Sequence, residues 1–303
     1  MTEPRHAEPL PLGGGDGLPY SRGLMARALV TAGVPVVRAY ELALRVGVDL
    51  TERGEEAVDL DRLEELALEV LGENEGSQAI RRLRRYEALR ELDLPIIVLI
   101  GGATGTGKST VATEVAHRLG ITRVTSTDVV RQTMRAFFSA EFMPSIHYSS
   151  FEVGKAVSRV EGDKRDPNLT GFLDQTRNVL VGVHAVLGRA LEEGYSLALE
   201  GVHIVPGMVR PPDGALVCQV LLAIEDEEDH ESHFWTRDAA SEGLRPFEKY
   251  LRALPDIRRI QDYLVKEAAK AGVPVIENSR VEETVDRVIA LVLDQIEREL
   301  EPA

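Results

Sequence analysis

The stretch IIVLIGGATGTGKST, residues 96–110, decides the fold. Five apolar residues run directly into a glycine-rich segment that ends in Lys108, Ser109 and Thr110. Read from Gly102, the segment has the spacing G-x-x-x-x-G-K-S, and it lies where this motif requires it, between an expected buried strand and an expected helix. The sequence therefore predicts a phosphate-binding loop at the end of a buried strand.

Each residue type in this loop has a physical role. Glycines let successive backbone N–H groups point inward at phosphate oxygens, and the following helix places its positive N-terminal end at the same spot. We expect Lys108 to neutralise the β- and γ-phosphates and the Ser109 hydroxyl to bind Mg²⁺. The predicted nucleotide-binding residues of the loop are Gly102, Ala103, Thr104, Gly105, Thr106, Gly107, Lys108, Ser109 and Thr110.

From Pro95 onward, short apolar runs alternate with longer helical stretches, as in parallel strands buried on both faces. We expect strands at Pro95–Ile100, Arg123–Thr127, Ser196–Glu200, Leu216–Ile224 and Val273–Ile276. We expect helices at Ser109–Leu119, Val129–Phe138, Phe172–Glu192, Glu227–Ala240, Pro246–Lys270 with a break at Pro255, and Val281–Leu300. This predicts an α/β fold with a five-stranded parallel sheet flanked by helices and with ligands at the carboxyl edge of the strands.

The second expected strand leads into Asp128, which opens the next helix. A carboxylate at this edge can take the proton of an acceptor hydroxyl, or it can simply cap the helix. Arg131 and Arg135 lie one turn apart on that helix, and two cations there suit an acidic acceptor; ordinary surface arginines are the alternative. We predict Asp128 as the base, and an acceptor site formed by Asp128, Arg131 and Arg135.

The third expected strand ends in Glu200, where a carboxylate can lie near Mg²⁺ and its waters. The predicted Mg²⁺ ligands are therefore Ser109 and Glu200. The sequence has no Cys/His cluster with zinc-ligand spacing, which argues against a structural zinc. Between the fourth and fifth strands, Arg237 and Arg245 lie on a segment bounded by Gly and Pro, which predicts a lid over ATP. We expect Arg237 to bind the nucleotide and Arg245 to act in catalysis; salt bridges at helix ends are the alternative.

The region before Pro95 has a different organisation. Residues 1–18 are rich in Pro, Gly and charge and predict a flexible tail. Residues 19–76 have compact helical periodicity and no strand, with one helix expected at Leu60–Leu71. Residues 77–94 predict a linker helix whose arginines either form a solvated face or reach nucleotide phosphates. Residues 95–303 complete the chain as the domain that carries the phosphate loop.

Composition limits the partners and the compartment. Lys and Arg number 35 against 50 Asp and Glu, a net charge of −15, so nucleic acids and anionic membranes are poor partners. The single cysteine, Cys218, cannot form an internal disulfide, and its apolar flanks predict a thiol packed in a strand. No apolar run approaches the ~18 residues of a membrane span, and a signal-peptide core is absent. We therefore expect a cytoplasmic protein that acts on small molecules.

Several segments together resemble 2-phosphoglycerate kinases: 95–109, 126–131, 199–207 and 250–263. That family joins a P-loop kinase domain to an N-terminal ATP-cone domain, and residues 19–24 and 39–43 are similar to the helical part of the cone. The resemblance covers about residues 19 to 295. An ATP-cone usually opens with a basic β-hairpin, whereas residues 11–17 read PLGGGDG, so we expect a reduced ATP-cone-like module.

The resemblance implies a kinase that transfers a phosphoryl group from ATP, with Mg²⁺, to a small anionic acceptor, 2-phosphoglycerate, giving 2,3-bisphosphoglycerate. Two alternatives stay open: a P-loop kinase for another acidic or sugar-like acceptor, and a nucleotide-sensing regulatory protein with slow turnover. Asp128 and the predicted lid favour catalysis, because a sensor needs neither. The sequence leaves open whether the chain forms a homo-oligomer and whether ATP is preferred to GTP.

Overall fold

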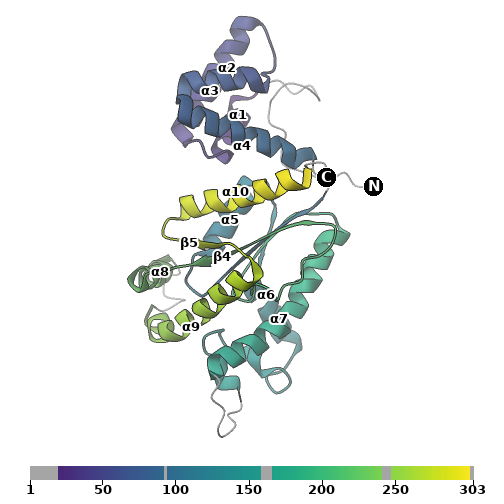
Figure 1. Cartoon of the computed structure of the whole chain (residues 1–303), viewed down its shortest axis with the longest axis vertical. Coiled ribbons are helices and arrows are strands. Elements are labelled where there is room, and N and C mark those ends of the chain that lie inside the picture. The colour runs from purple at the N-terminus through teal and green to yellow at the C-terminus, as the bar shows by residue number, and fades with distance from the viewer. Residues whose placement is uncertain (1–19, 92–93, 158–165, 241–246, 301–303) are drawn as a thin grey trace. The chain divides into compact units, whose positions relative to one another are not determined.

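The computed structural model describes residues 20–91, 94–157, 166–240 and 247–300. The chain divides into two compact units (Figure 1). One unit contains the N-terminal helices, and the other is an α/β unit formed by Leu94–His117 and Ile121–Leu291. The described part of the chain contains no helix with the length and apolar character that a membrane crossing would need.

The α/β unit is built on a five-stranded sheet, which confirms the predicted fold class. Its strands are β1 (Ile96–Gly102), β2 (Arg123–Ser126), β3 (Leu197–Glu200), β4 (Leu216–Ala223) and β5 (Val275–Glu277). All pairings are parallel, and the strand order is β2-β3-β1-β4-β5. Glu200 lies in register with both Ile100 and Ser126, so three strands end together at one edge.

Helices cover both faces of this sheet (Figure 1). They are α5 (Lys108–Arg118), α6 (Thr127–Phe137), α7 (Pro167–Glu192), α8 (Glu227–Ala240), α9 (Phe247–Ala271) and α10 (Val281–Leu300), with two short 3₁₀ helices, η1 (Pro144–His147) and η2 (Val153–Ala156). Val179 and Val183 of α7 pack with Leu99 of β1, and Leu264 of α9 packs with Leu221 of β4. These contacts place α7 and α9 on one face, because Leu99 and Leu221 point the same way in the paired strands.

The predicted break at Pro255 is wrong, because α9 runs through it without interruption. A proline inside a helix removes one backbone hydrogen bond and normally kinks or ends the helix. Here Leu254 and Ile257 flank the proline and are almost fully buried, and Ile260 and Leu264 continue the same apolar face. Burial of this face against the sheet offsets the local cost of the proline.

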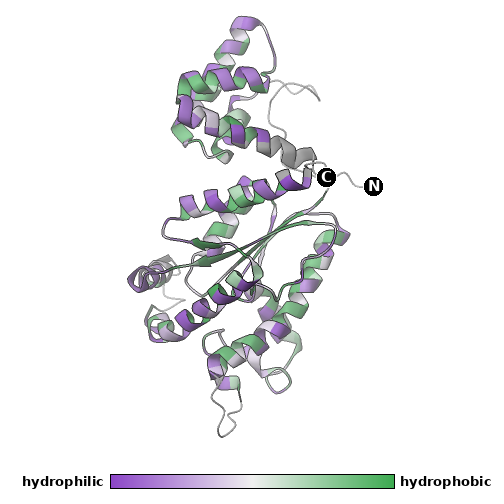
Figure 2. Ribbon diagram, in the orientation of Figure 1, coloured by the Kyte–Doolittle hydropathy of each residue, from purple (hydrophilic) through white to green (hydrophobic). Residues whose placement is uncertain are grey.

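Apolar side chains fill the inside of the α/β unit. Figure 2 shows green along the central strands, whereas α8 is mostly purple. Every residue of β1 and of β3 is buried, which fits the continuous apolar runs from which those strands were predicted. Cys218 of β4 is 4% exposed, and burial raises the pKa of its thiol to about 12. The prediction of a packed thiol is confirmed.

The helical unit consists of α1 (Arg22–Thr31), α2 (Val36–Arg53), α3 (Leu60–Leu71) and α4 (Glu73–Glu91). Its own apolar core includes Met25, Leu42 and Leu63, all fully buried. Arg84 of α4 makes exposed ion pairs with two acids of α3, Asp61 at 3.3 Å and Glu64 at 2.7 Å. The pairing of this arginine fits the solvated-face interpretation of the linker helix.

Candidate active site

The glycine-rich segment forms a tight loop between β1 and α5. Gly105 and Gly107 have positive φ angles of 91° and 77°, which other residues rarely adopt. A Cβ atom on Gly105 would lie 2.4 Å from a ring carbon of Phe234, and one on Gly107 would lie 2.3 Å from the side-chain nitrogen of Asn278. Both positions therefore require glycine for the backbone conformation and for the close approach of neighbouring side chains.

Side chains from distant elements hold the carbonyl groups of this loop. The contacts are His230 Nε2 with the Thr104 carbonyl at 2.8 Å, His233 Nδ1 with the Gly105 carbonyl at 3.0 Å, and Asn278 Nδ2 with the Thr106 carbonyl at 2.9 Å. Two of these donors come from α8, and the third follows β5 directly. The loop carbonyls are thus bound to the surrounding protein.

The N–H groups of the loop have a different environment. Within the described residues, no hydrogen bond is made by the backbone N–H of Thr104, Gly105 or Gly107. Because the carbonyls are held by other side chains, these donors are available to an anion, and the N-terminus of α5 adds its positive end. The arrangement is that of a phosphate cradle.

His230 is held neutral inside the protein. Its side chain is fully buried, and this burial lowers its pKa to about 4. Since Nε2–H donates to the Thr104 carbonyl, Nδ1 carries the lone pair, and this buried nitrogen has no hydrogen-bond partner. The His230 ring also stacks on Phe234 at 5.1 Å between centroids. His230 therefore fixes the loop as an uncharged donor.

Lys108 is the first residue of α5, and its side chain is largely buried at 9% exposure. Its ammonium group donates a hydrogen bond to the Ala103 carbonyl at 2.6 Å. The Thr106 hydroxyl donates to the same carbonyl at 3.0 Å. The lysine thus lies back along its own loop, with the positive charge at the phosphate cradle.

Ser109 and Glu200 meet across the site, as the sequence predicted them to do if they share a metal ion. The Ser109 hydroxyl donates to Glu200 Oε1 at 2.9 Å, and Glu200 is 9% exposed at the end of β3. Hard oxygen ligands of this kind fit Mg²⁺, which keeps several waters and takes few protein ligands. No group of three or more His, Cys, Asp or Glu side chains able to hold a metal occurs in the described residues.

Asp128 lies in the first turn of α6 and does not cap that helix. The N-cap is Ser126, whose hydroxyl accepts from the Val129 N–H at 3.2 Å, so the capping alternative for Asp128 is wrong. The Asp128 side chain is 66% exposed and accepts from Arg131 Nε at 3.2 Å. Partial burial of the carboxylate acts to raise the pKa of Asp128. The positive charge of Arg131 and its hydrogen bond outweigh this effect and hold that pKa below its usual value. Asp128 is therefore an accessible, ionised carboxylate.

Arg131 and Arg135 have different environments. Arg131 is 8% exposed, and its Nη1 donates to the carbonyls of Ile146 at 3.0 Å and Tyr148 at 3.1 Å. Arg135 is exposed and donates to Gln132, one turn back, at 3.1 Å. Arg131 therefore ties Asp128 to the segment around η1, whereas no hydrogen bond or ion pair among the described residues joins Arg135 to Asp128 or to that segment. Their predicted role in acceptor binding remains a prediction.

A row of buried, hydrogen-bonded polar side chains supports the start of α6. Thr127, His203 and Gln175 are all fully buried. Gln175 Nε2 donates to the carbonyls of Ser145 at 2.6 Å and Tyr148 at 2.9 Å, so its Oε1 accepts from His203 Nε2 at 2.9 Å. His203 Nδ1 must then accept the hydroxyl hydrogen of Thr127 at 2.8 Å.

Burial lowers the pKa of His203 to about 3, so the ring is neutral at physiological pH. Gly201 lets the chain come this close, because a Cβ there would lie 1.9 Å from the Thr127 hydroxyl. The row of buried side chains joins the end of β3, the start of α6, α7 and the segment around η1. It fixes the backbone from which Asp128 projects.

The predicted lid falls outside what the structure describes. Arg245 lies in residues 241–246, and the side chain of Arg237, at the end of α8, is likewise outside the described part. Thr110, in the first turn of α5, is exposed. The other predicted site residues, from Gly102 to Ser109 with Asp128, Arg131 and Glu200, lie at the carboxyl edge of the sheet.

Sequence reasoning missed the three donors that hold the loop, His230, His233 and Asn278. One signal was present for Asn278, because it follows the fifth strand directly and the carboxyl ends of parallel strands meet at one edge. Nothing near the two histidines in the sequence indicates that they bind the loop. The periodicity of their segment predicts a helix but not which residues that helix contacts.

Comparison with known proteins gives close relatives over nearly the whole chain. A 2-phosphoglycerate kinase of Methanopyrus kandleri is 39% identical over 288 residues, which cover 93% of this chain and 87% of the relative. Those of Pyrococcus horikoshii (37%, 92% of this chain and 91% of the relative) and Thermococcus kodakarensis (38%, 92% and 94%) are similar to the same extent. No family model matches.

Two solved structures show weaker likeness. A shikimate kinase from Acinetobacter baumannii in complex with shikimate has 14% identity and a TM-score of 0.39, covering 71% of this chain and 99% of its own. A gluconokinase from Sinorhizobium meliloti has 12% identity and a TM-score of 0.36, covering 69% and 96%.

Proposed function

The chain belongs to the 2-phosphoglycerate kinase family, and we propose that it transfers the γ-phosphoryl group of ATP to the hydroxyl group of 2-phosphoglycerate. The products are 2,3-bisphosphoglycerate and ADP. Identity of 37 to 39% over more than nine-tenths of the chain supports this assignment. We place the reaction in the cytoplasm, with small molecules rather than nucleic acids as partners, in keeping with the net charge of −15.

The observation that carries the proposal is the phosphate cradle. Its carbonyls are bound by side chains from α8 and from the end of β5, while three of its N–H groups have no partner within the described residues. Donors fixed in advance need no reorganisation when charge develops on the transferring group. Lys108 would add its positive charge at the β- and γ-phosphates.

Ser109 and Glu200 would hold the Mg²⁺ that accompanies ATP. Their oxygens lie 2.9 Å apart at the mouth of the cradle and suit a hard cation. When bound, the ion would neutralise phosphate charge and orient the β- and γ-phosphates. The two side chains supply only part of its ligands, and phosphate oxygens and waters would supply the remainder.

Asp128 would orient the acceptor. In the transfer, the acceptor oxygen forms a bond to the γ-phosphorus as the bond from that phosphorus to the ADP oxygen breaks. Because the pKa of Asp128 is held low, its carboxylate is a hydrogen-bond acceptor that aligns the hydroxyl and takes its proton late in the transfer. Arg131 and Arg135 are the proposed cations for the acidic groups of the acceptor, and Arg237 and Arg245 those of a lid.

We also propose that the helical unit is the reduced ATP-cone-like module expected from residues 19–76. The sequence resemblance in 19–24 and 39–43 supports this.

A coupled assay of ADP release tests the proposal. Wild-type protein with Mg·ATP should release ADP rapidly only when 2-phosphoglycerate is present, with glycerate, 3-phosphoglycerate and a hexose as comparison acceptors. Identification of 2,3-bisphosphoglycerate by mass spectrometry would establish the product. Preference for unphosphorylated glycerate or a sugar would reassign the acceptor, and slow ADP release that no acceptor accelerates would favour the regulatory alternative.

A further inference from the structure

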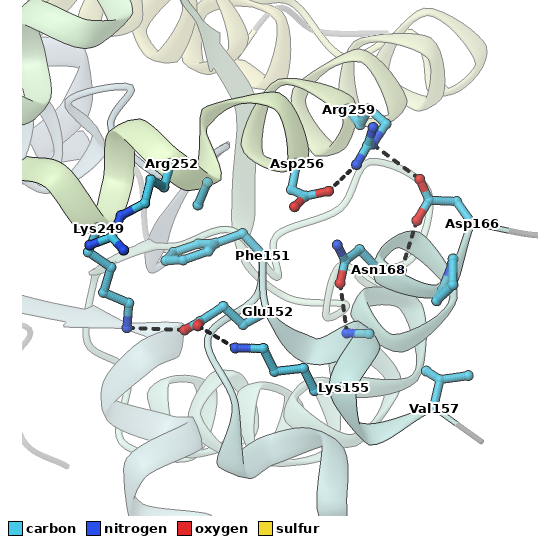
Figure 3. A pocket seen from close by; sticks show the side chains of 13 residues that line it. Phe151, Glu152, Lys155, Val157, Asp166, Asn168, Lys249, Arg252, Asp256 and Arg259 are labelled. Atoms are coloured by element: carbon cyan, nitrogen blue, oxygen red, sulfur yellow. Dashed lines mark hydrogen bonds and ion pairs between the residues drawn. The ribbon is translucent and has the colours of Figure 1, made fainter. Parts of the chain in front are cut away.

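A second hollow of the α/β unit is lined by residues that the site described above does not include. It is a cavity of about 1080 Å³ lined by η2, the start of α7 and the first half of α9 (Figure 3). None of its lining residues belongs to the phosphate cradle or contacts Asp128. Seven of the lining side chains are charged.

The charges are unevenly distributed over the cavity. Figure 3 shows Lys249 and Arg252 of α9 on one side, near Glu152 and Lys155. Glu152 is shared between Lys155 at 2.9 Å and Lys249 at 3.1 Å, so one carboxylate faces two ammonium groups. Arg252 is 79% exposed, and its ion pair with Glu248 is long, at 4.0 Å. This cationic end thus holds three positive charges and one negative charge within the cavity lining.

The opposite end has the reverse balance. Arg259 is shared between Asp166, at 3.2 Å, and Asp256. One cation therefore faces two carboxylates, and this acidic end has an excess of negative charge. Carboxylates at such a position accept hydrogen bonds from hydroxyl or amino groups.

Phe151 and Asn168 lie between the two ends (Figure 3). The Asn168 side-chain oxygen accepts from the Gly154 N–H at 2.9 Å, which fixes the amide so that its nitrogen is turned toward the cavity. That nitrogen has no hydrogen-bond partner among the described residues. The Phe151 ring offers an apolar surface, with the Lys249 ammonium 5.8 Å from its centroid.

We propose that this cavity is a binding site for a small hydroxy acid that carries a phosphate or carboxylate group. The acidic group binds Lys155, Lys249 and Arg252, and the hydroxyl groups bind Asn168 and the carboxylates of the acidic end. A surface of net charge −15 repels such a ligand unless cations are concentrated locally, and this cluster supplies that concentration. Arg252 offers the planar donor pair that suits either anion.

Two kinds of molecule have the chemistry of this ligand. The ligand is either the acceptor or product of the transfer, an assignment that rests on the proposed function and would place the acceptor's acidic group here instead of at Arg131 and Arg135, or another small acid that takes no part in the transfer. The residue after Lys249 is Tyr250, whose ring stacks on Phe234 at 5.3 Å, and Phe234 stacks on His230, which holds the phosphate loop. Lys249 of the cationic end is therefore next in sequence to an aromatic stack that reaches the phosphate loop.

Calorimetry on the full chain without nucleotide gives the direct test. The probes are inorganic phosphate, 2-phosphoglycerate and 2,3-bisphosphoglycerate. The variants are Lys249→Gln and Arg252→Gln, and the matched control is Lys266→Gln, which removes an exposed lysine from the same helix outside the cavity. We expect binding to weaken about tenfold or more in each cavity variant, as for the loss of a charge-assisted hydrogen bond, and to be unchanged in the control.

Steady-state kinetics on the same proteins identifies the source. An increase in KM for 2-phosphoglycerate, with KM for ATP unchanged, assigns the cavity to the acceptor. Weaker phosphate binding with both KM values unchanged assigns it to a separate acid. Binding of all three probes to both cavity variants as tightly as to wild type would overturn the proposal. Calorimetry needs no turnover, so a failure of the proposed function would leave this result interpretable.

Discussion

Replacing His203 by Gln tests the row of buried polar side chains beneath Asp128, and it does so through pH. His203 is fully buried with a pKa of about 3, whereas an ordinary histidine in the unfolded chain has 6.5. Between these two pH values, His203 binds a proton in the unfolded state but not in the folded state. Stability from this group is therefore complete above pH 6.5 and is lost as the pH falls toward 3.

The size of the effect follows from the shift. Each pH unit below the unfolded pKa costs about 1.4 kcal/mol until the folded pKa is reached. Between about pH 7 and about pH 5, His203 alone should cost roughly 2 kcal/mol of unfolding free energy. His230, with a folded pKa of about 4, adds a similar loss that the His203→Gln variant retains. The variant should therefore lose roughly 2 kcal/mol less than wild type over this range.

Urea unfolding at the two pH values measures this difference. The single tryptophan, Trp235, lies on α8, so its fluorescence follows the α/β unit. The matched control is His117→Gln, which removes an exposed histidine from α5 and is expected to keep the wild-type difference.

The comparison uses the change with pH, so a constant loss of stability from altered packing in His203→Gln cancels. Equal losses of unfolding free energy in wild type and His203→Gln would refute the reasoning, because they would show that the pKa of His203 is not lowered in the folded state. A loss in the control variant that differs from wild type would show that exposed histidines contribute instead.

Five further substitutions test the catalytic proposals. Lys108→Ala should lower kcat by roughly 10³-fold or more without unfolding the protein; wild-type turnover would exclude the phosphate-loop assignment. Asp128→Asn should lower kcat roughly 10²–10⁴-fold with little change in melting temperature, and lost stability with retained rate would mean a structural role. Arg135→Ala should raise KM for 2-phosphoglycerate about tenfold and leave KM for ATP unchanged; Arg131→Ala should do the same and also lower the melting temperature, because two carbonyls lose their donor. Glu200→Gln should weaken Mn²⁺ binding measured by electron paramagnetic resonance in the presence of ADP, and unaltered binding would remove Glu200 from the metal site.

Much of the α/β fold was predictable, because its signals are local. The phosphate loop is one continuous segment, and the apolar runs beside it match the strands to within a few residues; the helices Glu227–Ala240 and Val281–Leu300 were predicted with their observed bounds. Side-chain period and glycine placement act over a few residues, so they can be read along the chain. The meeting of Ser109 with Glu200 was also predictable, since strand ends of a parallel sheet share one edge.

The sequence by itself thus determined the sheet, the place of the phosphate loop and the meeting of Ser109 with Glu200, whereas the chemical roles of Lys108, Ser109 and Glu200 stay predictions. The tertiary structure decided which groups hold that loop, because the contacts of His230 and Asn278 span more than a hundred residues and arise only when the sheet is assembled. It also decided that Ser126 rather than Asp128 caps α6. The hydrogen bond that distinguishes a cap from a free carboxylate depends on backbone angles that residue type leaves open. The tertiary structure also decided that α9 continues through Pro255, because burial of its apolar face against the assembled sheet outweighs the local cost of the proline.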